Sequence, residues 1–281
     1  MRWLLSLLGA CYVNVPFAHS VRSCSVIAVL LCALLPSMHA DPVPVRQASG
    51  AIHGFLEMRS EDGRVVASGD VTRVVRGDRI TSRTVFRFRD GSVDDETTVF
   101  SQRRTFQLIS YRHIQKGASF PQPMDLAIDM KSGQVTVHST GKDGKAEDKI
   151  EHLDLPADLA NGLVPMLVEN MHPDSGATIT VGMVVATPKP RLVKLEITNV
   201  GEDKCLVAGS ARKAIHYEIK IDLGGVAGVV APIIGKAPPR IQIWTIGGTV
   251  TTFAREYGPL YGEGPMMTIQ LASPTWPSGA K

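Results

Sequence analysis

Cysteine is scarce in this sequence. The chain of 281 residues has four cysteines, and three of them, Cys11, Cys24 and Cys32, lie in the first forty residues. Only Cys205 remains beyond that region, so the body of the chain cannot form an intramolecular disulfide. A body of about 240 residues can bury an adequate core without one. We expect Cys205 to be a small apolar side chain in a half-buried strand rather than a reactive thiol.

An excess of charge of one sign is also lacking. The chain has 30 basic and 27 acidic residues, and removal of residues 1–40 takes away Arg2 and Arg22 and no acid, which leaves 28 basic residues. Aromatic residues make up 6% of the chain, and no basic stripe with interleaved aromatics occurs beyond residue 40. The electrostatic footprint of a nucleic-acid-binding protein is therefore missing, and we expect no nucleic-acid partner.

Motifs for catalysis and cofactor binding are absent as well. Gly235-Lys236 is followed by Ala237, so the hydroxyl that a phosphate-binding loop requires is missing, and no Gly-x-Ser-x-Gly motif occurs. We expect Asp94-Asp95-Glu96 to be a solvated sheet edge. No two of the histidines beyond residue 40 have a metal-ligand spacing; they are His53, His113, His138, His152, His172 and His216. We therefore assign no catalytic residue, metal or cofactor, and we lean against an enzyme.

No apolar run is long enough to cross a membrane. The run Val26–Leu35 has roughly half of the twenty residues that a spanning helix needs. Arg22 precedes it, Pro36 breaks it, and Ala40 stands before a polar, proline-rich start. This pattern predicts a signal peptide with an upstream leader over residues 1–40, and export to the periplasm or the extracellular space.

The leader leaves three alternatives. It has an apolar piece of its own, Trp3–Ala10, which a translation start downstream of Met1 would explain. Leu8-Gly9-Ala10-Cys11 resembles a lipobox, in which Cys11 would carry a lipid. An uncleaved leader would retain the protein through an N-terminal anchor.

Most of the chain after Ala40 has the period of β-strands. Val193, Leu195 and Ile197 alternate with charged or polar residues, and residues 217–223 repeat the pattern. Clean alternation is typical of antiparallel sheets with one solvated face. Asp90-Gly91 and Lys131-Ser132-Gly133 separate such runs as hairpin turns. We expect residues 41–281 to form one mainly β domain: a large curved antiparallel sheet, as a half-barrel or open barrel, with one or two short covering helices.

Two segments are expected to cover the concave face of this sheet. Residues 156–171 have helical spacing, with Pro165 predicted to kink the helix. Residues 224–236 are apolar and rich in small side chains, which suits a buried loop or an apolar flap. Together they supply the residues predicted to line an apolar ligand site: Leu159, Leu163, Met166, Leu167, Val226, Val229, Val230, Ile233 and Ile234.

Several stretches resemble an uncharacterised family of exported bacterial proteins. They are Gly69-Asp70, Phe86–Ser92, Glu96–Phe100, Leu159–Pro165, Val185–Lys194 and Gly224–Lys236. More loosely, the strand pattern with Pro238–Trp244 is similar to periplasmic domains of unknown function that share the open, curved sheet of the lipoprotein carriers. The second resemblance implies a half-barrel that holds an acyl chain or another apolar ligand. Neither implies a catalytic residue.

Three functions remain. The first is a non-catalytic module that binds an apolar or lipid-like ligand, and we favour it. The second is a hydrolase or other enzyme, which would need polar groups such as His113, Asp129 or His216 to converge. The third is a structural or partner-binding envelope protein with an exposed apolar patch. The sequence leaves transient membrane association and the oligomeric state open.

Overall fold

The computed structural model describes residues 43–140, 145–172, 174–186, 189–222, 238–247 and 250–272. The chain divides into two units, Met1–His39 and Ala40–Lys281, and every described residue belongs to the second. The predicted leader and the apolar segment 224–236 lie outside the described residues.

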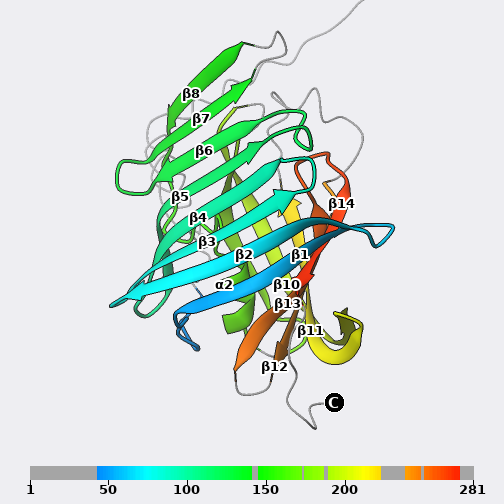
Figure 1. Cartoon of the computed structure of the whole chain (residues 1–281). Helices are drawn as coiled ribbons and strands as arrows, with labels where there is room; N and C mark the ends of the chain where they lie inside the picture. Colours follow the sequence, from blue (N-terminus) through cyan, green and yellow to red (C-terminus); the bar gives the residue numbers. More distant parts are fainter. Residues whose placement is uncertain are drawn as a thin grey trace, which may run out of the picture. The chain divides into compact units, whose positions relative to one another are not determined.

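The second unit is one antiparallel sheet of 14 strands, shown in Figure 1. Its order is β8-β7-β6-β5-β4-β3-β2-β1-β14-β13-β12-β11-β10-β9, so every strand except the first and last of this series has two partners. The strands are β1 (Ile52–Ser60), β2 (Val65–Arg76), β3 (Arg79–Phe88), β4 (Val93–Gln102), β5 (Phe106–Lys116), β6 (Met124–Asp129), β7 (Gln134–Thr140), β8 (Ala146–His152), β9 (Thr178–Val185), β10 (Arg191–Val207), β11 (Ser210–Asp222), β12 (Ile241–Gly247), β13 (Thr251–Pro259) and β14 (Met266–Leu271). The predicted fold class, one large unclosed antiparallel sheet, is confirmed.

Local sequence explains the hairpins. Gly91 and Gly133 have φ values of 84° and 70°, which glycine adopts at no steric cost, and they occupy the predicted turns between β3 and β4 and between β6 and β7. The alternation in β10 is also confirmed, because Val193, Leu195 and Ile197 are buried while their neighbours are more exposed.

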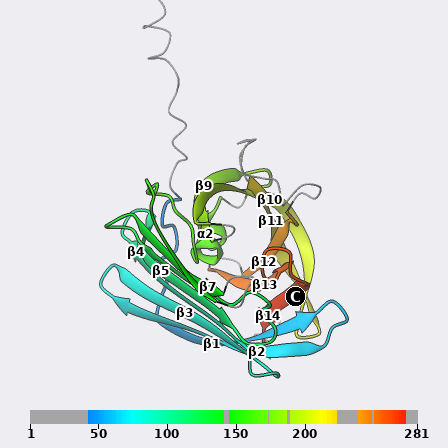
Figure 2. The ribbon, with the colours of Figure 1, turned by 90° about the horizontal axis from the view of Figure 1, so that it is seen from above.

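The sheet curls around the helix of the described chain, α2 (Val164–Asn170), as Figure 2 shows. The predicted helix 156–171 is shorter than expected, and the predicted kink at Pro165 is wrong. Pro165 lies in the first turn of α2, where a missing backbone N–H costs no helical hydrogen bond. No helix in the described part of the chain has the length and apolar character needed to span a membrane.

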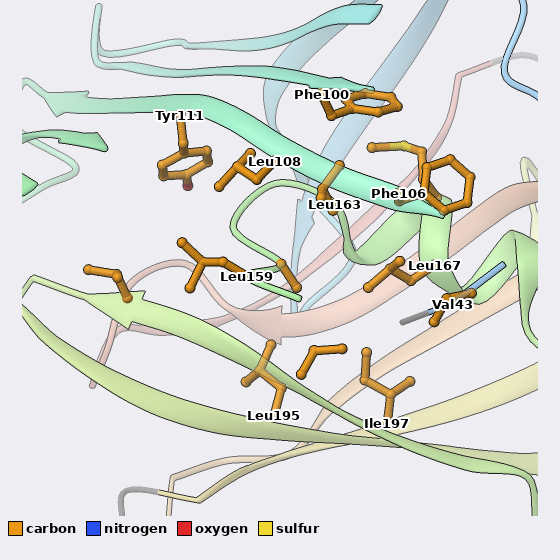
Figure 3. Close-up of a cluster of buried hydrophobic side chains, with 14 of the residues drawn as sticks. Val43, Phe100, Phe106, Leu108, Tyr111, Leu159, Leu163, Leu167, Leu195 and Ile197 are labelled. Carbon is orange, nitrogen blue, oxygen red and sulfur yellow. The ribbon is translucent and has the colours of Figure 1, made fainter. Parts of the chain in front are cut away.

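The main core lies between α2 and the two sides of the curl. Figure 3 shows Leu159, Leu163 and Leu167 between Leu108 on β5 and Leu195 on β10. All three leucines are at most 4% exposed. The curled sheet and the helix α2 therefore pack against each other around a dense hydrophobic core.

The segment before α2 also protects one edge of the sheet. The side chain of Asn161 donates to the Val184 carbonyl at 2.9 Å and accepts from the Val184 N–H at 2.8 Å. The Ala160 N–H donates to the Gly182 carbonyl at 2.8 Å. These bonds satisfy backbone groups of β9 that an edge strand would otherwise leave unpaired.

Candidate functional site

A band of polar side chains crosses the concave face of the sheet. Thr84, Glu96 and His113 are successive partners on β3, β4 and β5, and Asp94 is paired with Gln115 in the next row. Paired residues of antiparallel strands share a face. Glu96 therefore faces the same side as Phe100, which belongs to the main core, and so does Asp94.

This placement corrects one expectation. Asp94 and Glu96 do not form a solvated sheet edge, because β4 lies inside the sheet and both side chains face its concave side. Only Asp95 points outward, where it forms an ion pair with Arg83 at 2.6 Å. The sequence could not reveal this, since three successive acids give no alternation from which to choose a face.

Glu96 is at the centre of the polar band. It accepts a hydrogen bond of 2.7 Å from the hydroxyl of Tyr111 on β5. Burial raises the pKa of Tyr111 well above its ordinary value, and the charge of Glu96 adds to this effect. Tyr111 therefore remains a hydrogen-bond donor throughout the physiological pH range.

Glu256 on β13 faces the same interior as Glu96, because it is paired with Ile243 of the main core. Burial, and to a smaller extent the negative charge of Glu96, raise the pKa of Glu256 to about 7. In the strand order, β3, β2, β1 and β14 separate the two residues, so the curl of the sheet brings them together. The two carboxyls therefore interact electrostatically across the interior, and Glu256 holds its proton up to near neutral pH.

A second group adjoins this pair. His113 Nε2 lies 2.8 Å from Asp94 Oδ1, and Gln115 Nε2 donates to Asp94 Oδ2 at 2.8 Å and to the Leu260 carbonyl at 3.2 Å. Burial by itself would lower the pKa of His113, but the hydrogen bond and charge of Asp94 outweigh burial and raise it. The negative charge of Asp94 and the positive charge of protonated His113 therefore compensate each other.

A buried ion pair joins α2 to the same interior. Arg73 on β2 lies 3.9 Å from Glu169 on α2, and the Phe253 N–H donates to the other oxygen of Glu169 at 2.8 Å. Burial lowers the pKa of Arg73 and raises that of Glu169. Because Arg73 lies on the sheet and Glu169 on the helix, this ion pair links α2 to β2. Removal of either partner would leave a buried charge uncompensated.

Apolar side chains beside Glu256 keep part of their surface accessible. Ile269 is paired with Glu256 and also with Met58, so it shares their concave face. The inward-facing residues of this region that are half-buried rather than fully buried include Val71, Phe253, Met267, Ile269 and Leu271. The concave face is thus densely packed around α2 and less completely covered near β1, β13 and β14.

The predicted ligand-lining residues divide into two sets. Leu159, Leu163, Met166 and Leu167 belong to the main core. Packed in this way, they would touch a ligand only if the α2 segment moved. Their five predicted partners, Val226, Val229, Val230, Ile233 and Ile234, lie outside the described residues. A binding role for either set remains a prediction.

The polar residues proposed for an enzyme do not converge. His113 is in the interior, whereas Asp129 accepts from the Lys131 N–H in a turn, and His216 stacks on Trp244 elsewhere. Within the described ranges, no three His, Cys, Asp or Glu side chains are placed to hold a metal ion. Sequence reasoning missed Tyr111, Glu256, Arg73 and Glu169, because nothing local to these residues indicates which face they occupy.

Comparisons with known proteins identify neighbours of unknown function. No protein-family model matches the chain, and no curated protein matches it. One similar crystal structure is the hypothetical lipoprotein YmcC from Escherichia coli, with 10% identity, a TM-score of 0.37, and coverage of 92% of this chain and 100% of that one. Another is a β-barrel-like protein of the domain of unknown function DUF1849 from Brucella abortus, with 11% identity, a TM-score of 0.39, and coverage of 79% of this chain and 94% of that one. Similarity at this level transfers no function to this chain.

Proposed function

We propose that this is an exported protein that binds an apolar or lipid-like ligand on the concave face of its sheet. The supporting observation is the set of half-buried, inward-facing apolar residues beside the Glu96–Glu256 pair, of which Ile269 is the clearest. Apolar side chains that face the inside of a curled sheet and keep accessible surface are the usual lining of a small-molecule site. Export rests on the pattern of residues 1–40.

The energetics favour an amphipathic ligand over a purely apolar one. Each 100 Å² of apolar surface that a ligand covers contributes about 2.5 kcal/mol before the entropic costs of binding. The carboxyls of Glu96 and Glu256 lie beside this surface and cannot be covered by hydrocarbon without losing hydration. A ligand with a hydrogen-bonding head group would contact both regions.

The test uses the full chain expressed with its own leader. We expect native mass spectrometry and organic extraction to find a copurified apolar molecule, and the delipidated protein to bind N-phenyl-1-naphthylamine saturably. Ile269→Trp should occupy the space and weaken probe binding. Val74→Trp is the control, because Val74 is 52% exposed on the outer face. Absence of both a copurified ligand and saturable probe binding would refute the proposal.

The carboxyl pair favours one second candidate, acid–base hydrolysis. Glu256 with a pKa of about 7 could donate a proton while Glu96 acts as a base, since two carboxyls held in different protonation states suit these roles. A panel of chromogenic esters and glycosides tests this, with Glu256→Gln expected to abolish turnover. No turnover by the wild-type protein would reject this candidate and leave the binding proposal intact.

A further inference from the structure

A hollow on the outer face of the sheet is separate from the interior site. It has a volume of about 320 Å³ and lies between the β1–β2 turn, which contributes Glu61, and the end of β10 with the β10–β11 turn, which contribute Leu206 and Gly209. Its floor includes Arg255 and Tyr257 on β13 and Thr268 on β14. Arg255 adjoins Glu256 in sequence and points to the opposite side of the sheet, so the two sites are independent.

A stack of rings fixes the position of Arg255. The Arg255 guanidinium lies over the Trp244 ring, with Cζ 5.2 Å from its centroid. Trp244 in turn stacks on His216, with centroids 4.7 Å apart and an interplanar angle of 5°, and its indole N–H donates to Asp203 Oδ2 at 2.9 Å. Contacts of a cation with an aromatic face reduce the freedom of the arginine side chain. Arg255 is therefore already oriented before any ligand arrives.

Among the described residues, Arg255 has neutral hydrogen-bond partners only, Thr268 and Cys205. Its Nε is buried and has no hydrogen-bond partner in the described structure, and its Nη2 reaches Thr268 Oγ1 only at 3.4 Å. Within the described ranges, no acidic side chain lies at ion-pair distance from Arg255. The nearby Cys205 is a neutral thiol whose pKa is raised by burial, although Arg255 acts in the opposite direction.

The hollow contains two further charged side chains, Arg59 and Glu61. Arg59 forms an ion pair of 2.8 Å with Glu57, and Glu61 accepts a hydrogen bond of 3.0 Å from the Tyr257 hydroxyl. Arg255 is thus the one basic side chain of the lining without an acidic partner in the described structure, whereas Glu61 is an acidic group of the same hollow with a neutral partner. The Nε of Arg255 is buried, so a ligand would meet its terminal Nη groups, which can donate to two oxygens of a carboxylate or phosphate.

We propose that this hollow binds a small ligand through an oxyanion group, a carboxylate or a phosphate, that is held by Arg255. The volume is at the low end of the range for small-molecule sites, which favours a compact ligand. Thr268 and the Arg59 guanidinium stand beside Arg255 and supply further donors. An apolar ligand would leave these donors uncovered, and a cation would meet the repulsion of Arg255 as well as the attraction of Glu61.

The experiment follows the indole N–H signal of Trp244 by NMR in the ¹⁵N-labelled full chain, assigned with Trp244→Phe. Sodium phosphate and sodium acetate are titrated separately at constant ionic strength, with sodium chloride as the reference. We expect a saturable shift with phosphate or acetate and none with chloride, and the stronger of the two identifies the oxyanion class. Arg255→Gln should weaken this binding at least about tenfold, because a charge-assisted hydrogen bond is lost.

Two further variants keep the test decisive. Arg255→Lys retains the charge without the planar guanidinium and should bind the oxyanion with an affinity between those of the wild type and Arg255→Gln. It also provides the test if Arg255→Gln fails to fold. Arg87→Gln is the control, because Arg87 lies on the outer face in an ion pair with Asp70 and away from the hollow. No saturable shift with either oxyanion, or equal affinity in the wild type and Arg255→Lys and Arg255→Gln, would overturn the proposal.

Discussion

Glu256 should make the stability of this protein fall as the pH rises toward neutrality. Its pKa is raised from 4.5 to about 7 in the folded state, first by burial and second by Glu96. Below pH 4.5 the carboxyl is protonated in both the folded and the unfolded state, and it has no effect on stability. Between pH 4.5 and 7 the unfolded state loses the proton and the folded state keeps it, so the unfolded state gains in relative stability.

The size of the effect follows from the shift. Each pKa unit corresponds to about 1.4 kcal/mol, so a rise from 4.5 to about 7 costs the folded state about 3 kcal/mol once the pH exceeds 7. This is a large part of the 5–15 kcal/mol that typically separates folded from unfolded domains. Glu256→Gln removes the titration while it keeps the shape of the side chain.

Urea denaturation at several pH values between 4.5 and 8 measures this contribution. We expect the free energy of unfolding of the wild type to fall by about 3 kcal/mol relative to Glu256→Gln over this range. Glu263→Gln is the matched control, because Glu263 is exposed, and its curve should follow the wild type. Parallel pH profiles for the wild type and Glu256→Gln would refute the assignment of a buried, proton-holding carboxyl to the interior.

Three further predictions concern the surroundings of the site. Asn161→Ala should lower the free energy of unfolding by about 2–4 kcal/mol in urea denaturation, because it removes both hydrogen bonds to Val184 at the β9 edge. Gly162→Ala should destabilise more than Gly91→Ala in the same assay: both glycines have positive φ, but a Cβ at Gly162 would overlap the Thr98 hydroxyl, whereas Gly91 faces open space. Asp94→Asn should lower the pKa of His113 in an NMR titration, since the hydrogen bond and charge of Asp94 raise this pKa in the wild type. The raised pKa means that protonated His113 stabilises the folded wild-type protein at acid pH, and this stabilisation is lost as the pH rises through the folded-state pKa of His113.

The elements of this fold could be predicted because their determinants are local. The alternation around Val193–Ile197 depends only on the two-residue period of a strand, and the turns at Gly91 and Gly133 depend on the freedom of glycine to adopt positive φ. Such signals also indicated one large antiparallel sheet. Pro165 was ambiguous locally, because proline both breaks a helix and begins one, and the packing of Leu163 and Leu167 against the sheet decided where α2 starts.

The candidate site depends on geometry that no local pattern contains. Glu96 and Glu256 are far apart in the sequence and are separated by four strands in the sheet, so only the accumulated curl makes them neighbours. The outer hollow likewise forms only because the β1–β2 and β10–β11 turns lie beside β13. The register shift between Asn199 and Gly201 also changes the side of the sheet on which the side chains at the end of β10 lie. The sequence by itself determined the strands, the turns and one sheet, because these follow from neighbours along the chain. The tertiary structure alone decided which charged groups became buried, because that follows from how far the sheet bends.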